Sequence, residues 1–342
     1  MRACVIHAAG DVRLDDREER SLAAGEVRLS FAHGGVCGSD IHYVAHGRVG
    51  DSVVRDPMVL GHEFSGTVLE THADVTGLAP GDKVAVNPAL PCGECRYCAA
   101  GQSNLCTDMR FMGSAARHPH QHGGFAARPV VAAAQCIPVP AETDLRHLAL
   151  AEHYKKTFHE LSLDGDLTGQ RVLVTGAGVI GQLLAIAARR AGAAEITMAD
   201  VVPAALERAQ ELGADYIVDS SAAEAAEALR AEMACDTAFE ASGAPAATNL
   251  CIESLRPGGC LAQVGFLPPE ALLTLAKLLT RELRILGTYR FTTEFAEAVR
   301  QIVAGEVDLR RLISADLSLD DPQAVFRAAQ DKARNLKVMV TF

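Results

Sequence analysis

A buried strand that runs directly into a glycine-rich turn constrains the fold of this chain more than any other feature. The apolar run RVLVT ends at Gly176, the turn continues through Gly178 to Gly181, and the helix-forming stretch QLLAIAARRAG follows. A bare GxGxxG pattern is weak evidence, but a strand before it and a helix after it form the context in which this turn binds a dinucleotide. The sequence therefore predicts a βαβ unit with a pyrophosphate at the start of its helix.

The residues of this turn have separate tasks. Gly176 permits the tight turn, Gly178 lets backbone N–H groups approach the pyrophosphate, and Gly181 lets the helix pack close to the strand. We expect Val179 and Ile180, which lie between them, to belong to the same cofactor site.

The residue that ends the next predicted strand, EITMAD, indicates which dinucleotide is bound. The carboxylate of Asp200 can accept hydrogen bonds from a ribose diol but would repel a 2′-phosphate. Val201 and Val202 offer no cation to compensate that repulsion. We therefore expect NAD as the cofactor, with NADP less favoured.

The pattern of the chain changes near its middle. Up to about Leu150, short alternating segments such as EVRLSF and GDKVAV are separated by Gly, Pro and Asp turns, which is typical of a β-rich region. From Gln170, apolar strands such as YIVD and CLAQVGF alternate with Ala-rich helical stretches. That alternation predicts right-handed crossovers in a parallel sheet, so the fold class is α/β.

The composition excludes several classes of protein. With 342 residues, 49% of them hydrophobic and 22% charged, the chain is long enough for two domains and too apolar to be disordered. No apolar stretch could span a bilayer, and a formal net charge of -11 disfavours nucleic acid as the main partner. The opening MRACVIHAAG shows no export signal, so we expect a cytoplasmic protein that acts on a small molecule.

Four cysteines in one short loop predict a structural zinc site. The stretch CGECRYCAAGQSNLC is too short to bury a core of its own, and four thiolates fill a tetrahedral zinc ion completely. Disulfides are the alternative, but they would need an oxidising compartment. The ligands that we expect are Cys92, Cys95, Cys98 and Cys106.

A second metal centre is predicted from two turn-rich motifs. Cys37 lies in GGVCGSDIH, and His62 and Glu63 lie in GHEFSG. One thiolate, one imidazole and one carboxylate leave a fourth position on zinc for water or substrate, as a catalytic site requires. Each residue alone has an ordinary explanation as a core or surface side chain. Beside a cysteine-rich zinc loop and a dinucleotide fingerprint, the metal interpretation is favoured.

Together these motifs carry a family resemblance. GGVCGSDIH, GHEFSG, the four-cysteine loop and GAGVIG are similar to stretches of the zinc-dependent medium-chain dehydrogenase/reductase family, over essentially the whole chain. Within that family the chain is most similar to the sorbitol dehydrogenase branch. The stretches NLCTDMRFMGSAARHPHQHGGF and GTYRFTTEFAEAV resemble those of bacterial L-idonate 5-dehydrogenases.

The resemblance implies roles for further residues. Glu152 matches the carboxylate that contacts the catalytic metal or its water, and Ser39 and His42 match a relay that passes a proton to solvent. The positions that match the substrate pocket are Tyr43, Phe111, Ser114 and Arg290. An arginine there also suits the carboxylate of a sugar acid, because it offers paired N–H donors.

The resemblance also implies an architecture. A GroES-like, β-rich catalytic domain with both zinc sites is expected over residues 1–152 and is completed by residues 288–342. A Rossmann doubly wound parallel sheet that binds NAD is expected over residues 153–287, with the active site between the two domains. We expect a homo-oligomer, either a tetramer or a dimer.

The activity that the resemblance implies is a reversible oxidation of a secondary hydroxyl with zinc and NAD. L-idonate, oxidised to 5-keto-D-gluconate, is the expected substrate. A neutral polyol such as sorbitol or xylitol is the alternative within the same class. A homologue that binds the cofactor but turns over poorly is the alternative from a different class.

One segment departs from the family pattern close to the expected chemistry. After Glu152 the family normally has a proline and an apolar helix, whereas residues 153–166 are HYKKTFHELSLDGD. Lys155 and Lys156 would place ammonium groups where relatives bury aliphatic side chains, so the helix must rotate, expose them or pair them. Impaired activity, a remodelled pocket and a harmless exposed helix all remain open.

Overall fold

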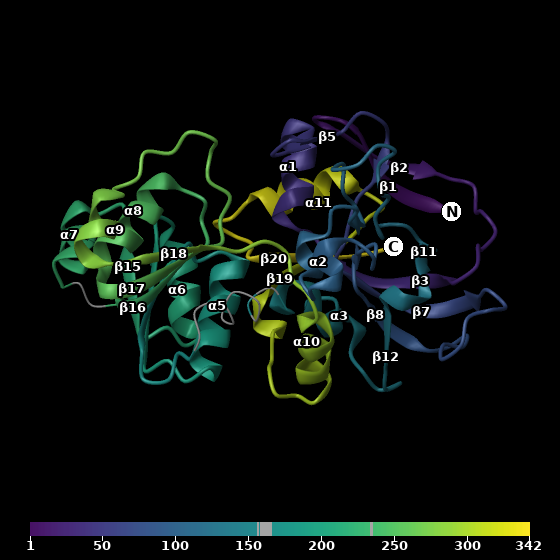
Figure 1. The fold of residues 1–342 in the computed structure, drawn as a ribbon. Coiled ribbons are helices and arrows are strands. Elements are labelled where there is room, and N and C mark those ends of the chain that lie inside the picture. The colour runs from purple at the N-terminus through teal and green to yellow at the C-terminus, as the bar shows by residue number, and fades with distance from the viewer. Residues whose placement is uncertain (156, 158–165, 233–234) are drawn as a thin grey trace. The chain divides into compact units, whose positions relative to one another are not determined.

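The computed structural model describes residues 1–155, 157, 166–232 and 235–342, and within them the chain forms two compact units (Figure 1). The first unit contains Met1–Lys155, Thr292–Asp331 and Asn335–Phe342. The second unit contains Lys156–Phe291 and Lys332–Arg334, so in sequence it interrupts the first.

A mostly antiparallel sheet organises the first unit. Its strands, in spatial order, are β12 (Cys136–Val139), β8 (Lys83–Val86), β7 (Phe64–Thr71), β3 (Glu26–Gly35), β20 (Lys337–Thr341) and β19 (Ile313–Ser318), with β11 (Val130–Ala132) also paired to β3. Because side chains alternate between the two faces of a strand, Val27, Leu29 and Phe31 of β3 all enter the core. Phe31 packs there against the rings of Phe64 and Phe125, each 6.1 Å away.

Shorter elements complete this unit. The other strands are β1 (Arg2–Ala8), β2 (Asp11–Asp16), β4 (Arg48–Val49), β5 (Ser52–Val53), β6 (Met58–Val59), β9 (Ala89–Leu90) and β10 (Arg110–Phe111). The helices are α1 (Gly38–His46), α2 (Arg96–Ala99), α3 (Leu145–Leu148), α10 (Glu294–Val303) and α11 (Pro322–Gln330), with 3-10 turns η1 (Ser103–Leu105), η2 (Ala133–Gln135) and η3 (Arg310–Leu312). Residues 151–155 are helical as well.

A six-stranded parallel sheet organises the second unit. Its spatial order is β15 (Tyr216–Asp219), β14 (Glu195–Asp200), β13 (Arg171–Thr175), β16 (Cys235–Glu240), β17 (Leu255–Gln263) and β18 (Arg284–Gly287). The strand order reverses between β13 and β16, which makes the sheet doubly wound, as the sequence predicted. Ligands of such sheets bind at the carboxyl ends of the strands, beside this reversal.

Helices cover both faces of the parallel sheet (Figure 1). They are α5 (Val179–Arg190), α6 (Pro203–Glu211), α7 (Ala223–Glu232), α8 (Pro245–Ser254) and α9 (Ala276–Arg281). α5 and α6 connect β13, β14 and β15 on one face, while α7 and α8 pack against each other on the opposite face. Because both faces are covered, the central strands are apolar throughout; Leu173 and Val174 of β13, for example, are fully buried.

Two glycines hold the turn between β13 and α5. Gly176 has φ of 91°, in the left-handed region, and a Cβ there would lie 2.8 Å from the backbone nitrogen of Ser242. A Cβ on Gly181 would overlap the carbonyl oxygen of Gly176, so the helix could not pack as closely. Gly178, by contrast, has no atom within 4 Å of an added Cβ.

Among the described residues, no helix combines the length and the apolar character that crossing a membrane requires.

We predict that Gly181→Ala destabilises the second unit while Gly178→Ala does not. The added methyl at position 181 must displace the turn, at a cost of about 1–3 kcal/mol that is typical of overpacking. The same methyl at position 178 enters open space and should change the free energy of unfolding by less than about 1 kcal/mol. Urea unfolding followed by circular dichroism measures both; equal midpoints for the two variants would contradict this account of the turn.

Candidate active site

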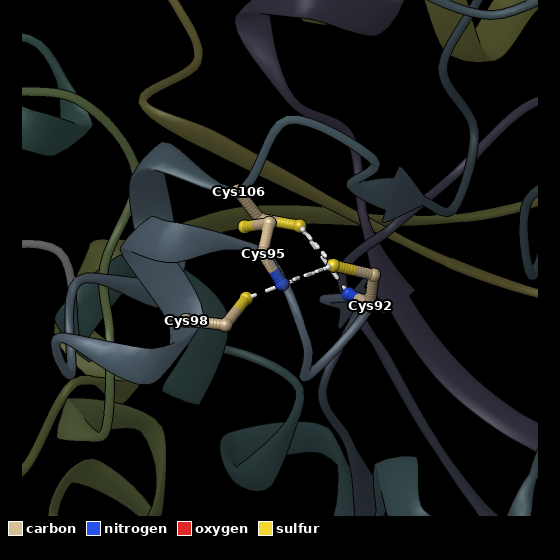
Figure 2. Close-up of side chains that lie close together, drawn as sticks. All are labelled: Cys92, Cys95, Cys98 and Cys106. Atoms are coloured by element: carbon tan, nitrogen blue, oxygen red, sulfur yellow. Dashed lines mark hydrogen bonds between the residues drawn. The ribbon is translucent and has the colours of Figure 1, made fainter.

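The four cysteines of the loop lie together (Figure 2). Cys95 caps the start of α2, Cys98 lies on that helix, and the 3-10 turn η1 leads to Cys106. The sulfur of Cys92 is 3.5 Å from that of Cys106 and 4.0 Å from that of Cys98. Thiolates that share one zinc ion at about 2.3 Å lie roughly 3.8 Å apart, so this spacing fits zinc.

Backbone N–H groups support thiolates in this loop. The N–H of Cys92 donates to the Cys106 sulfur at 3.3 Å, and the N–H of Cys95 donates to the Cys92 sulfur at 3.4 Å. The N–H groups of Cys98 and Thr107 lower the pKa of the Cys95 thiol to about 5. A metal ion requires deprotonated sulfur, and these N–H groups favour that form at Cys95.

The second group of candidate ligands lies at one end of the sheet of the first unit. Cys37 caps the start of α1, and His62 and Glu63 immediately precede β7. Their ligand atoms all lie within 4.8 Å of one another, although the two motifs are far apart in sequence. His62 and Glu63 are 5% and 0% exposed, so water does not compete for them. This group is called the Cys37 centre below.

A buried carboxylate ties the two motifs of the Cys37 centre together. Asp40, fully buried on α1, accepts hydrogen bonds from the N–H of Cys37 at 3.0 Å and from the N–H of Gly61 at 3.2 Å. Its other contact is with Nδ1 of His62, 3.8 Å away. At this distance there is no hydrogen bond, so Asp40 acts on the ring of His62 through its charge, which raises the pKa of His62.

A buried ion pair holds Glu63. The ammonium group of Lys337, at the start of β20, donates to Oε2 of Glu63 and to the carbonyl oxygen of Val36 at 3.0 Å. Both charged side chains are at most 1% exposed. Gly35 makes room for the pair, because a Cβ there would lie 2.5 Å from Oε2 of Glu63 and 2.6 Å from Cε of Lys337.

Glu152, His153 and Lys155 extend the Cys37 centre. Nδ1 of His153 lies 2.7 Å from Oε1 of Glu63 and 3.5 Å from Oε2 of Glu152. The ammonium group of Lys155 donates to Oε1 of Glu152 at 2.8 Å and lies 5.0 Å from the centre of the Phe295 ring. Glu63, Glu152 and His153 therefore form a second set of possible metal ligands that shares Glu63 with the first.

The charges of the Cys37 centre fit a divalent cation. The buried ammonium groups of Lys155 and Lys337 offset two of the negative charges around it. Two further negative charges remain, which is the charge that a zinc ion balances. The negative groups are the Cys37 thiolate and the carboxylates of Asp40, Glu63 and Glu152.

The pKa values of these groups also show that the negative groups of the centre favour positive charge beside them. Burial lowers the pKa of His62, but the Cys37 thiolate and Asp40 raise it to about 10. Burial also lowers the pKa of His153, but Glu63 raises it to about 8. In turn, burial would raise the pKa of the Cys37 thiol, but the charge on His62 holds it well below its ordinary value. Desolvation raises the pKa of Asp40 to about 6.

Two buried ligand atoms are consistent with a metal in this centre. Within the described part of the chain, Oε1 of Glu63 and Nδ1 of His153 have no hydrogen-bond partner. Buried polar atoms are rarely left without one, because the loss costs free energy. A thiolate, an imidazole and a carboxylate are ligands that zinc accepts, so the donor set fits a zinc ion.

Asp200, at the end of β14, accepts a hydrogen bond from the glycine-rich turn between β13 and α5. Oδ2 of this residue accepts from the N–H of Ala177 at 2.5 Å, and Oδ1 accepts from those of Val201 and Val202 at 2.7 and 2.9 Å. A carboxylate has about four acceptor positions, so Asp200 can still accept from a ribose. Gly178 caps the start of α5 and is exposed there, with Val179 and Ile180 half-buried behind it.

Known protein families match both halves of this arrangement. The family described as alcohol dehydrogenase GroES-like domain matches residues 23–141, and the family described as zinc-binding dehydrogenase matches residues 179–304. The chain is 39% identical to L-idonate 5-dehydrogenase (NAD(P)(+)) of Escherichia coli K12, over 92% of this chain and 91% of that protein. It is 32% identical to sorbitol dehydrogenase of Gallus gallus, over 99% of this chain and 95% of that protein.

A solved structure matches the whole fold. The crystal structure of L-idonate 5-dehydrogenase from Escherichia coli K-12 superposes with a TM-score of 0.95 and 37% identity, over 100% of this chain and 98% of that chain. The chain belongs to the zinc-dependent medium-chain dehydrogenase family. The predicted fold class and the prediction of an alcohol or polyol dehydrogenase are therefore confirmed.

In this dehydrogenase, the residues predicted for the proton relay lie on α1, directly after Cys37. Ser39 is half-buried and His42 is exposed, with its ring 5.8 Å from that of His46. A path from the Cys37 centre towards solvent along this helix is compatible with their exposure. Their role in proton transfer stays a prediction.

The residues predicted for the substrate pocket lie in both units. Phe111 is close to the Cys37 centre, since its ring lies 5.5 Å from that of His62. Tyr43 is buried, and its hydroxyl accepts from the N–H of Ala115 at 3.0 Å, while Oγ of Ser114 accepts from the N–H of Ala116 at 3.2 Å. Arg290 belongs to the second unit, where its guanidinium lies over the ring of Tyr289 at 4.7 Å.

Of the two lysines in the segment that departs from the family pattern, the structure describes Lys155. Lys155 is completely buried and is paired with Glu152, so pairing is the solution that the structure adopts for this charge. Burial lowers the pKa of Lys155 to about 8. Lys156 and residues 158–165 lie outside the described residues.

Three residues of the Cys37 centre were missed by the sequence analysis: Asp40, His153 and Lys337. Asp40 lies within the GGVCGSDIH motif, three residues after the helix cap, where a side chain can bond back to the cap. His153 follows Glu152 directly, and this position next to a candidate metal-contacting carboxylate is the signal that could have identified it. Lys337 gave no signal, because only the pairing of β20 with β3 brings it to Glu63.

We predict that Lys337→Met destabilises the protein strongly. Removing the ammonium group leaves Glu63 as a buried charge without its partner, which typically costs about 3–5 kcal/mol of unfolding free energy. Lys83→Met is the matched control: Lys83 is half-buried in the same sheet and, among the described residues, donates to the carbonyl of Thr143 alone, so about 1 kcal/mol or less is expected. Denaturant unfolding compares them, and equal losses would refute the special role of Lys337.

We predict that Cys95→Ser opens the four-cysteine loop. Loss of one thiolate should release about one zinc ion per chain and expose the loop to protease, because the metal supplies the folding free energy of such a segment. Cys136→Ser is the control, since that buried cysteine lies outside both clusters. Zinc analysis with limited proteolysis tests both variants; a Cys95→Ser protein with full zinc content and an intact loop would argue against a structural zinc.

Proposed function

We propose that this dehydrogenase catalyses the reversible, NAD-linked oxidation of a secondary hydroxyl of a sugar acid, L-idonate to 5-keto-D-gluconate. The observation that carries the proposal is the Cys37 centre, where the ligand atoms of Cys37, His62 and Glu63 lie within 4.8 Å of one another. The relative of 39% identity named L-idonate 5-dehydrogenase supports the substrate.

A zinc ion held by Cys37, His62 and Glu63 would supply Lewis acidity that lowers the pKa of a substrate hydroxyl. The surrounding residues prepare that site. Lys337 holds Glu63 in place through Oε2, while Oε1 lies 2.7 Å from Nδ1 of His153, and the charge of Asp40 raises the basicity of His62. Exclusion of water from this buried cluster strengthens each of these interactions.

Oxidation of an alcohol removes a proton from oxygen and a hydride from carbon. We assign the proton to Ser39 and then to His42, because they lead from the half-buried start of α1 to its exposed face. The hydride goes to the nicotinamide ring of the cofactor. The GAGVIG turn would hold its pyrophosphate, through Gly176, Gly178 and Gly181 and the start of α5.

NAD is the preferred cofactor in this proposal. The carboxylate of Asp200 retains an acceptor position for a ribose hydroxyl and would repel a 2′-phosphate. The relative in Escherichia coli is named for both NAD and NADP, so the preference is a proposal about this chain's own turn.

Two alternatives have specific support. Sorbitol dehydrogenase of Gallus gallus is 32% identical over nearly the whole chain, which favours a neutral polyol as substrate. A homologue that binds cofactor but turns over poorly is favoured by the presence of His153 beside Glu63. Arg290, if it binds a carboxylate, favours the sugar acid over the polyol.

A substrate panel tests the proposal. We predict NADH formation with L-idonate, a higher kcat/KM than with sorbitol or xylitol, and a higher kcat/KM with NAD than with NADP. Arg290→Lys should lower kcat/KM for L-idonate but not for sorbitol, because only the acid uses paired N–H donors. A clear preference for sorbitol would replace the substrate, and bound cofactor without turnover of any substrate would favour the non-catalytic alternative.

A further inference from the structure

His153 occupies an unusual place for a buried histidine. Its side chain is only 6% exposed, and no hydrogen-bond partner for Nδ1 is found among residues 1–155, 157, 166–232 and 235–342. The nearest group is Oε1 of Glu63 at 2.7 Å, which equally lacks a hydrogen-bond partner. The two atoms lie at ion-pair distance without hydrogen-bond geometry, so a cation that contacts both of them would satisfy their lone pairs.

The position of His153 is compatible with a shared metal ion. Donor atoms that bind one tetrahedral zinc at about 2.0–2.1 Å lie roughly 3.3 Å apart. The distances from Nδ1 of His153 to Glu63 and to Glu152, 2.7 Å and 3.5 Å, bracket that separation. The ring also interacts with the Cys37 thiol, so it touches two of the three expected ligands.

The other groups nearby are already engaged. Lys337 holds the second oxygen of Glu63, and Lys155 holds one oxygen of Glu152. Among the described residues, neither ammonium group donates to Nδ1 of His153. The lone pair of that nitrogen can bind either a proton donor or a metal ion, and a metal ion at the Cys37 centre would fill this role.

We propose that His153 is a fourth protein ligand of the metal ion at the Cys37 centre, together with Cys37, His62 and Glu63. This inference rests on the zinc site of the proposed function. With four protein ligands a tetrahedral zinc has no free position, so substrate binding must displace His153 or add a fifth ligand. His153 is thereby a group that competes with the substrate hydroxyl for the metal.

The first test measures zinc affinity. The metal-stripped full-length chain is titrated with zinc against a chromophoric chelator, for wild type, His153→Ala and His147→Ala. Loss of a direct ligand should weaken the zinc affinity of one of the two sites by roughly 100-fold or more. Loss of a residue that only contacts a ligand typically weakens metal affinity by about 10- to 100-fold. His147 is the matched control, a buried histidine outside both clusters whose Nε2 accepts from the N–H of Leu309.

The second test separates a ligand from a neighbour of a ligand. With cobalt in place of zinc, His153→Gly should shift the visible absorption bands, and added imidazole should restore them. Imidazole should leave the wild-type spectrum unchanged, because the position is filled. Bands that are identical in wild type and His153→Gly, or unchanged zinc affinity in His153→Ala, would overturn the proposal and indicate a simple ion pair with Glu63.

A third measurement needs no variant and covers the case in which the substitutions prevent folding. In a crystal structure of zinc-loaded wild type, the distance from Nδ1 of His153 to zinc should be about 2.0–2.1 Å. A distance beyond about 3 Å, outside any zinc–nitrogen bond, would overturn the proposal while leaving the proposed function intact. A wild-type chain that binds only the zinc of the four-cysteine loop would overturn both.

Discussion

The buried carboxylate of Glu63 is the constraint on which the Cys37 centre of the first unit depends. A charge that is fully removed from water must be compensated, and here Lys337 compensates it from a strand near the end of the chain. Gly35 leaves the space in which the pair fits, and the pairing of β3 with β20 sets its position. The antiparallel sheet thus does more than form a core: it fixes one oxygen of Glu63 through Lys337, while the other oxygen lies 2.7 Å from Nδ1 of His153.

The same balance of charge explains the surroundings of the Cys37 centre. Asp40 joins the GGVCGSDIH and GHEFSG motifs through backbone N–H groups. The candidate metal ligands therefore lie together although the end of α1 and the strands β4, β5 and β6 separate the two motifs in sequence. Lys155 neutralises Glu152, which allows a second carboxylate to approach the first. In the four-cysteine loop the sulfurs of Cys92 and Cys106 instead accept hydrogen bonds from backbone N–H groups.

Much of this could be predicted from the sequence, for identifiable reasons. The βαβ unit could be predicted because the tight turn leaves no room for a Cβ at Gly176 or Gly181, so the glycines are visible in the sequence. The cysteine loop is local, so spacing alone indicated its ligands. The family and the fold class are confirmed, whereas the individual roles of the site residues remain predictions. Lys337 could not be found, since its importance arises only from strand pairing, and His153 was overlooked because it belongs to no recognised motif.

The most direct test of this account is the zinc stoichiometry of the metal-stripped chain. The Cys37 centre and the four-cysteine loop should together bind two zinc ions per chain, and Cys37→Ala should bind one, with the loop site unchanged. A wild-type chain that binds a single zinc ion, or a Cys37→Ala chain that still binds two, would contradict the claim that Cys37, His62 and Glu63 form a metal centre.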